Sequence, residues 1–205
     1  MTQDGGTKCP CGLDEAGFVA GVGPAPCRIM LVGEAPGATE VRKGLPFVGP
    51  SGQFLSLLLS EAGLTRNDVY ITNVVKCRPP GNRKPTPSEC RSCRDKFTGE
   101  LIDVNPQVVI TLGDTALKAL TTGVSLKTAH GLPLKRGEYT LVPMYHPAAA
   151  LHQPNLRATL LSDWRGLQSK LERPSPPATL PIEMVGDVAD FFKVYVPLAV
   201  DTETD

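Results

Sequence analysis

Three short apolar runs in this chain of 205 residues are each followed at once by a polar turn. The runs and the segments that follow them are 29–32 with 33–37 (GEAPG), 69–72 with 73–80 (NVVKCRPP), and 141–144 with 145–149 (YHPAA). Short apolar runs that end at Gly, Pro or polar residues are typical of buried strands. The sequence therefore predicts three strands whose carboxyl ends carry polar side chains.

Segments with helical signals alternate with these runs. Residues 51–62 carry a broad apolar stripe that ends at Gly63, and Thr86 with Glu89 forms a capping box for a helix that runs towards Val104. The other expected elements are a strand at 108–112, a helix at 114–120 and a helix at 155–171. This alternation predicts an α/β fold, a three-layer α/β/α sandwich with a mostly parallel central sheet. In such sheets ligands bind outside the carboxyl ends of the strands, so the three polar turns are expected to build one pocket.

Composition predicts a single globular domain. Hydrophobic residues make up 41% of the chain and charged residues 20%, and no run approaches the roughly 18 apolar residues of a membrane span. The first residues lack the regions of a signal peptide, so we expect a cytoplasmic protein with no membrane partner. We assign residues 1–172 to the domain, 173–181 to a Pro-rich linker and 182–205 to a tail.

Six cysteines and a local cluster of basic residues are the unusual features of the composition. Clustered cysteines in a cytoplasmic chain favour metal binding over disulfides. The formal net charge is zero, yet basic residues crowd into one segment: Lys76, Arg78, Arg83, Lys84, Arg91, Arg94 and Lys96. Such a strip is either a solvated face or a source of phosphate contacts to nucleic acid.

The motifs together resemble family 4 uracil-DNA glycosylases. The resemblance covers GEAPG at 33–37 with GLPFVG at 44–49, ITNVVKCRPP at 71–80, and YHPAA at 145–149, and extends from about residue 9 to 171. It implies an α/β sandwich that carries a [4Fe–4S] cluster and removes uracil from DNA in base excision repair. The expected partner is uracil-containing DNA, and we expect a monomer.

The resemblance implies roles for three pocket residues. The Asn73 amide would read the Watson–Crick edge of a flipped uracil, whose N3–H and O4 complement an amide, whereas cytosine presents the opposite pattern. Phe47 would stack on the base. His146 would hydrogen-bond uracil O2 and stabilise the departing anion, as an oxyanion hole does.

Other residues have broader or alternative roles. Gly33 and Ala35 would line the substrate site, and Glu34 is the first candidate for positioning the attacking water. Glu40 could do so instead, or could close the pocket against the methyl group of thymine. Leu151 could wedge into the base stack or start a helix as a core residue, and Lys76, Arg78, Arg83 and Lys84 would bind the DNA backbone.

The cluster ligands implied by the resemblance are Cys9, Cys11, Cys77 and Cys93. The spacing between Cys9 and Cys11 is one residue shorter than in the family, so Cys27 or Cys90 could replace Cys9. Thiolates also suit tetrahedral zinc, which is the alternative metal.

The tail contains a second resemblance. Residues 198–205 (LAVDTETD) resemble the first motif of a DEDD-type 3′–5′ exonuclease, with Asp201 and Glu203 at the end of a strand. We therefore expect the chain to be the front of a longer phage or prokaryotic protein with an exonuclease or polymerase. The alternative to the glycosylase activity is a non-catalytic DNA-recognition module of such a replication protein, and a redox-sensing cluster is a third hypothesis.

Overall fold

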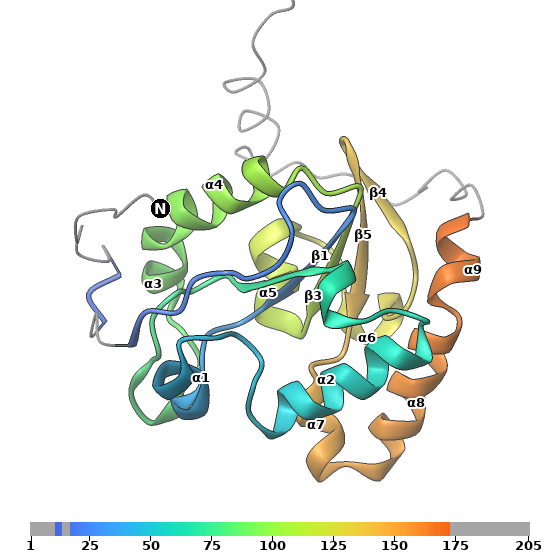
Figure 1. Cartoon of the computed structure of the whole chain (residues 1–205), viewed down its shortest axis with the longest axis horizontal. Coiled ribbons are helices and arrows are strands. Elements are labelled where there is room, and N and C mark those ends of the chain that lie inside the picture. Colours follow the sequence, from blue (N-terminus) through green and yellow to red (C-terminus); the bar gives the residue numbers. More distant parts are fainter. Residues whose placement is uncertain (1–10, 14–16, 173–205) are drawn as a thin grey trace, which may run out of the picture.

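The computed structural model describes residues 11–13 and 17–172. Its centre is a five-stranded sheet in the order β2-β1-β3-β5-β4 (Figure 1). The strands are β1 (Ile29–Gly33), β2 (Tyr70–Asn73), β3 (Val108–Leu112), β4 (Leu134–Arg136) and β5 (Tyr139–Met144). The first four in this spatial order are parallel, and only the β4–β5 pair is antiparallel. Cys9, the linker 173–181 and the tail 182–205 lie outside the described residues.

Nine α-helices occur in the described part of the chain. They are α1 (Ala38–Lys43), α2 (Pro50–Glu61), α3 (Pro87–Ser92), α4 (Arg94–Val104), α5 (Asp114–Leu120), α6 (Leu126–Ala129), α7 (Pro147–His152), α8 (Pro154–Arg165) and α9 (Leu167–Glu172). Two short 3₁₀ turns are η2 (Arg66–Asp68) and η3 (Pro80–Asn82). The capping box of Thr86 and Glu89 is confirmed, but the helix that it starts is interrupted at Cys93. The expected last helix is likewise divided at Gly166 into α8 and α9.

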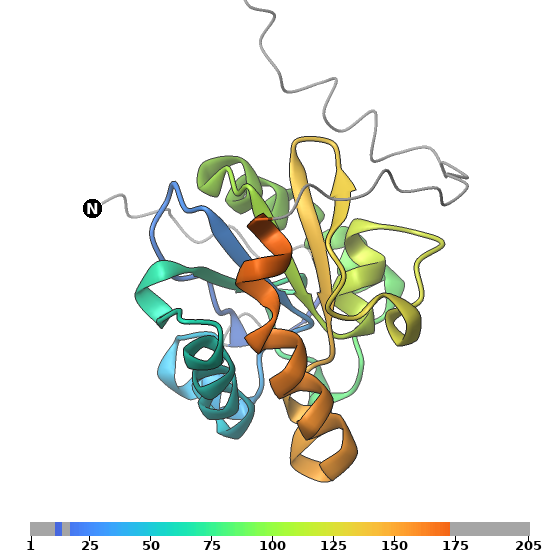
Figure 2. The ribbon, with the colours of Figure 1, turned by 90° about the vertical axis from the view of Figure 1, so that its right-hand side faces the viewer.

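Alternate residues of strand β1 face two different helical layers. Ile29 and Leu31 pack in one apolar cluster with the buried residues of α2 and α8. Met30 and Val32 pack in a second cluster with those of α4 and α5. Because strand side chains alternate between faces, these two clusters are the two sides of the sheet. The sheet lies between the two helical layers (Figure 2), which confirms the predicted three-layer α/β/α sandwich.

The parallel strands bring the predicted turns to one edge of the sheet. Gly33 and Asn73 are register partners at the ends of β1 and β2, and the Val74 amide donates to the Gly33 carbonyl at 3.0 Å. At the end of β3, a Cβ on Gly113 would lie 3.2 Å from the His146 Cβ. Three strand ends separated in sequence therefore meet beside the residues predicted to form the pocket.

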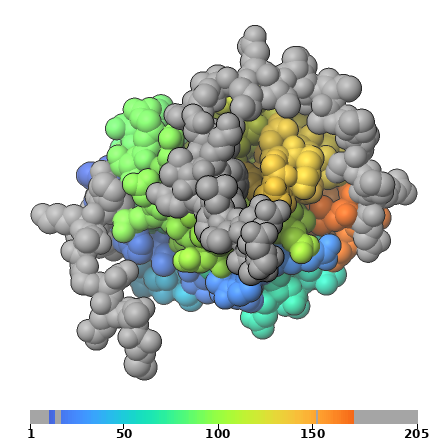
Figure 3. Space-filling model, turned by 90° about the horizontal axis from the view of Figure 1, so that it is seen from above, coloured from blue at the N-terminus to red at the C-terminus, as the bar shows by residue number. Residues whose placement is uncertain are grey.

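The β4–β5 hairpin forms one lateral edge of the sheet, and the sequence did not predict it. β4 pairs with β5 as an antiparallel edge strand, and Leu134, Lys135 and Arg136 are only partly buried or exposed. Figure 3 shows this hairpin in yellow at the molecular surface. Within residues 11–13 and 17–172, no helix combines the length and the apolar character that crossing a membrane requires.

Candidate active site

Gly33, Phe47 and Asn73 converge at the end of β1. A Cβ on Gly33 would lie 2.4 Å from Asn73 Oδ1 and 2.5 Å from Phe47 Cζ. Real Cβ atoms do not approach other atoms so closely, so only glycine lets the aromatic ring and the amide share this space. The first and second motifs therefore build a single site through the position that lacks a side chain.

The amide of Asn73 has an unused acceptor inside this site. Asn73 is 2% exposed, and none of the residues that the structure describes donates a hydrogen bond to its Oδ1. A buried acceptor without a donor costs about 1–3 kcal/mol, so such atoms are rare and need an explanation. A ligand that carries an N–H group would supply the missing donor.

Phe47 forms a buried aromatic wall and occupies an uncommon backbone conformation. Its φ is 53°, in the left-handed region that non-glycine residues seldom adopt, and its side chain is 5% exposed. Glu40 Oε1 accepts hydrogen bonds from the Val48 and Gly49 amides at 3.0 and 2.7 Å, directly after this residue. Glu40 is itself buried, so its carboxylate fixes the segment that carries the Phe47 ring.

His146 is the N-cap residue of α7 and faces the same wall, with its ring centroid 5.6 Å from that of Phe47. Its Nδ1 accepts a hydrogen bond from the Ala148 amide at 3.1 Å, so in the neutral ring the proton resides on Nε2. Burial lowers the pKa of His146 to about 4, although the nearby Glu40 carboxylate opposes this shift. At neutral pH the side chain is therefore an uncharged hydrogen-bond donor through Nε2.

Glu34 is half-buried in the turn after β1 and is anchored from another element. Its Oε2 accepts a short hydrogen bond from the Thr115 hydroxyl of α5, and its backbone carbonyl accepts from the Val75 amide. The neighbouring Ala35 is partly buried against the apolar cluster of the α4 and α5 side. Leu151 lies on α7 and is 43% exposed, so it is not the core residue of the alternative interpretation.

Thr115 was missed by the sequence analysis. A signal was present, because Thr115 lies in the first turn of α5, three residues beyond the end of strand β3, whose carboxyl end lies between those of β1 and β5. A polar residue just beyond such a strand end deserves the same scrutiny as the three turns.

Lys76 does not belong to a DNA-binding strip, contrary to our expectation. Its side chain is 1% exposed, and its Nζ donates to Thr72 Oγ1 at 2.5 Å and makes a short ion pair with Glu100. Glu100 also accepts from the Gly21 amide at 2.9 Å, so the buried pair fastens the segment before β1 to β2 and α4. A lysine enclosed in this way cannot reach a phosphate group.

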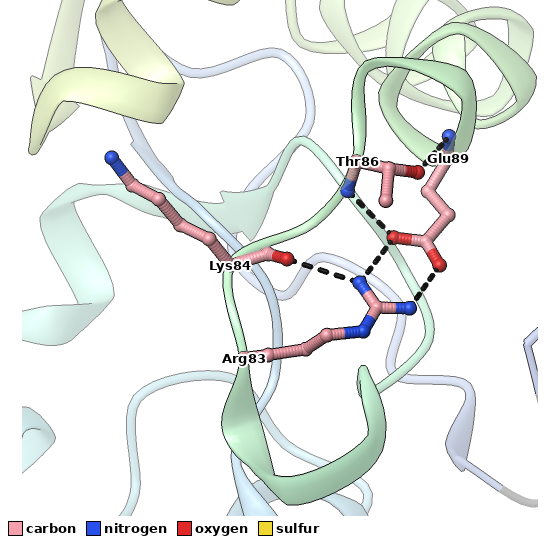
Figure 4. Close-up of polar contacts among 4 residues, drawn as sticks. All are labelled: Arg83, Lys84, Thr86 and Glu89. Atoms are coloured by element: carbon pink, nitrogen blue, oxygen red, sulfur yellow. Dashed lines mark hydrogen bonds and ion pairs between the residues drawn. The ribbon is translucent and has the colours of Figure 1, made fainter.

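The other three residues predicted to bind the DNA backbone remain accessible to different degrees. Arg83 makes a two-pronged ion pair with Glu89, at 2.9 and 2.6 Å, and the Thr86 amide also donates to that carboxylate (Figure 4). The Lys84 side chain points away from this group and is 67% exposed, 3.9 Å from Asp114 Oδ2. Arg78 donates through Nε to Asn82 at 2.7 Å. Their role in binding DNA stays a prediction.

Three of the predicted ligand cysteines are buried in the same extended apolar cluster, which also contains Cys27. Cys11, Cys77 and Cys93 are buried in the cluster on the α4 and α5 side of the sheet, and an isolated bridge pairs Phe18 with Cys77. Their donor chemistry and burial suit a metal–sulfur cluster. Among residues 11–13 and 17–172, however, no three His, Cys, Asp or Glu side chains are arranged closely enough to hold a metal ion.

Cys27 lies at the opposite end of α4 from Cys93, too far away to replace Cys9 as a ligand. The Cys27 amide donates to the carbonyl of Val104 at the end of α4, whereas Cys93 precedes the first residue of that helix. Eleven residues of helix separate the two ends, about 16 Å at the rise of an α-helix. Cys90 lies one turn before Cys93, and burial and then the nearby Glu34 raise the pKa of its thiol.

Comparison with known proteins identifies similar chains. The model of a family described as the uracil DNA glycosylase superfamily matches residues 20–168. A type-4 uracil-DNA glycosylase of Thermotoga maritima is 40% identical over 172 residues, which cover 82% of this chain and 90% of that protein. Another, from Archaeoglobus fulgidus, is 40% identical over 167 residues and covers 77% of this chain and 84% of its own length. A DNA polymerase of Bacillus phage SP01 is 33% identical over 157 residues, which cover 76% of this chain but 17% of the polymerase.

Proposed function

The chain belongs to the uracil-DNA glycosylase superfamily, and on that premise we propose that it excises uracil from DNA. The reaction hydrolyses the bond between uracil N1 and the deoxyribose C1′, and it leaves an abasic site. The Watson–Crick edge of a base inside a duplex is inaccessible to protein groups, so the nucleotide must first be flipped into the pocket.

The buried, unpartnered Oδ1 of Asn73 is the observation that carries this proposal. Uracil presents N3–H beside the O4 carbonyl, so one amide accepts from the first and donates to the second. Cytosine has an unprotonated N3 beside an amino group, and it would leave the Asn73 acceptor without a donor at N3. Unpaired polar groups in a closed site are costly, which supports strong discrimination by this residue.

Phe47 would contribute to binding of the base, and His146 would contribute to breaking of the glycosidic bond. The Phe47 ring offers a flat apolar surface on which the base stacks. As the C1′–N1 bond breaks, both bonding electrons leave with the uracil, and negative charge develops on its carbonyl oxygens. The Nε2–H group of neutral His146 would donate to O2 and stabilise that charge more strongly in the transition state than in the bound substrate.

We assign the attacking water to Glu34 rather than Glu40. One oxygen of Glu34 is held by Thr115, which leaves the other oxygen to orient a water molecule towards C1′ and to accept its proton. Glu40 instead uses one oxygen to bind the two amides after Phe47, and its burial supports a role in shaping the pocket wall.

We further propose that Cys9, Cys11, Cys77 and Cys93 hold a [4Fe–4S] cluster. Cys9 lies outside the described residues, and the other three share the buried cluster described above. When bound, the metal–sulfur group would supply a covalent tie between the amino-terminal segment and the segment from Cys77 to Cys93.

The phage polymerase relative supports a proposal on the context of this domain. This chain aligns with only 17% of that polymerase, so a glycosylase-like unit is one part of a longer replication protein there. We propose a similar fusion here, through the segment after residue 172, in a prokaryote or phage. Arg78, Arg83 and Lys84 would contact DNA phosphates, and the exposed Leu151 on α7 would wedge into the base stack.

The enzyme and the non-catalytic DNA-recognition module are separated by one assay. The protein is incubated with a labelled oligonucleotide that contains one uracil, and abasic sites are revealed by alkaline cleavage. The proposal predicts a strand break at the uracil position and none in a matched oligonucleotide with thymine. DNA binding without abasic sites, at full iron content, would favour the non-catalytic module.

A further inference from the structure

Arg66 lies outside every predicted motif, yet it makes two hydrogen bonds to the segment that carries Phe47. Its Nη1 donates to the Phe47 carbonyl at 3.0 Å and its Nη2 to the Pro46 carbonyl at 2.9 Å. A guanidinium group presents these two donors in a rigid plane, so it fixes both carbonyl groups at once. The two peptide units concerned lie on either side of the left-handed Phe47 backbone.

Helix α2 packs against the backbone of the same turn. A Cβ on Gly52 would lie 1.9 Å from the Phe47 oxygen and 2.1 Å from its carbonyl carbon. The backbone of Phe47 therefore rests directly on that of Gly52, with no space for a side chain between them. Together with the bonds from Glu40 to the next two amides, these contacts hold an unfavourable conformation that would otherwise relax.

Arg66 is itself held in place by its own turn. The Thr65 amide and hydroxyl both donate to Asp68 Oδ2, at 2.8 and 2.6 Å, and form a capping box around η2. This turn leads directly into β2, the strand that ends at Asn73. The same connection thus fastens the aromatic wall to the strand that carries the proposed uracil-reading amide.

We propose that Arg66 is a positioning residue that sets the Phe47 ring at stacking distance from the base held by Asn73. The proposal rests on the function proposed above and adds a residue that acts through Phe47 without touching the base. If Arg66 acts only through Phe47, replacing Arg66 should lower the rate of uracil release only while the Phe47 ring is present.

A double-mutant cycle measures that dependence. Single-turnover rates of uracil release are compared for the wild type, Arg66→Ala, Phe47→Ala and the double variant. We expect Arg66→Ala to lower the rate roughly tenfold, the net worth of a hydrogen bond from a charged donor. In the Phe47→Ala background the same change should lower the rate less than about twofold. A full tenfold effect in both backgrounds would overturn the proposal, because Arg66 would then act independently, for example on a DNA phosphate.

Arg165→Ala is the matched control, since it removes a surface arginine that pairs with Glu61. Glu61 is the last residue of α2, nine residues or about 13 Å along the helix from Gly52. Arg165→Ala should leave the rate unchanged. Arg66→Lys should recover only part of the loss, because one ammonium group cannot donate to two carbonyls in a fork.

Amide hydrogen exchange tests whether Arg66 stabilises the Phe47 turn, and it does not depend on activity. We expect the amides of Val48 and Gly49 to exchange faster in Arg66→Ala and in Gly52→Ala than in the wild type, and Arg165→Ala to have no effect. Unchanged exchange in Arg66→Ala would overturn the proposal. A wild type that releases no uracil would overturn the proposed function instead, and the exchange result would still decide whether Arg66 holds the Phe47 turn.

Discussion

At the scale of single residues, the candidate site presents neutral groups to a ligand. Asn73 offers a buried acceptor to which no described residue donates. His146 offers an uncharged donor, because its pKa is low and its Nδ1 already accepts a hydrogen bond. Neither group requires a proton from solvent to take up its proposed role. The charged groups nearby, Glu34 and Glu40, are instead held by hydrogen bonds from the protein.

The pKa of His146 is a direct consequence of this arrangement. Burial lowers it to about 4, below the usual value near 6.5. The unfolded chain therefore binds a proton at this residue between about pH 6.5 and 4 while the folded chain does not, so burial of His146 makes stability fall as the pH drops through that window. An NMR titration of the imidazole signals, assigned with a His146→Asn variant, should give a midpoint near 4. A midpoint near 6.5 would contradict the buried, neutral histidine.

At the scale of helices and strands, the sequence predicted more than it missed. Strand β3 was predicted with both of its ends, and β1, β2 and α2 were predicted within one residue at each end, because apolar runs and Gly or Pro stops reflect local preferences. β4 was missed because three residues of mixed polarity carry no strand period. The break at Cys93 was missed because the capping box marks where a helix begins and says nothing of where it ends.

The site was predicted less completely than the fold, and for a physical reason. The turns at strand ends follow from the parallel topology, so Gly33, Asn73 and His146 were placed correctly near one edge. The burial of Lys76 depends on Glu100, which lies on a helix distant in sequence. The left-handed conformation of Phe47 likewise depends on contacts from α2 and η2, and no local pattern reports such contacts.

The hydrogen bonds of Glu89 at the start of α3 should contribute stability that depends on pH. The hydrogen bonds from Arg83 are the main cause that lowers the pKa of Glu89 to about 2, and burial opposes them. Because the folded pKa is depressed, this stabilisation is present above about pH 4.5 and is lost as the pH falls towards 2. Glu89→Gln should therefore destabilise the protein by about 1 kcal/mol at pH 7, as loss of a helix cap does.

The difference in unfolding free energy between Glu89→Gln and the wild type should shrink as the pH is lowered from about 5 to 2. Urea denaturation at several pH values measures it. Glu138→Gln, which removes an exposed carboxylate from the β4–β5 hairpin, is the control and should show no such trend. A difference that is constant with pH would mean that the carboxylate charge does not contribute.

At the scale of the whole molecule, the amino-terminal segment is fastened along β2 and its continuation. Backbone hydrogen bonds join Val19 to Lys76 at 2.8 Å and Arg78 to Gly17 at 3.2 Å. The buried pair of Lys76 and Glu100 adds a further link through the Gly21 amide. A metal–sulfur group held by Cys11 and Cys77 would tie the same two segments once more.

Substitutions of single cysteines should therefore divide into two groups. Cys77→Ser and Cys93→Ser should lose most of the iron and of the visible absorption of a [4Fe–4S] cluster, together with yield of folded protein. Cys27→Ser should keep both, because Cys27 lies at the far end of α4. Iron analysis of anaerobically purified variants gives the answer, and loss of iron in Cys27→Ser would contradict the ligand set.

The central claim is that this molecule reads uracil with the Asn73 amide and then removes it, and single-turnover release of uracil by the wild type and by Asn73→Asp tests that claim most directly. The substitution preserves the shape of the side chain and replaces the amide donor that would face uracil O4 with an acceptor. By the cost of a buried unpaired polar group, the account predicts that the wild type releases uracil and that Asn73→Asp does so roughly a hundredfold more slowly or worse. Equal rates in the two proteins, or no release by the wild type at full iron content, would contradict it.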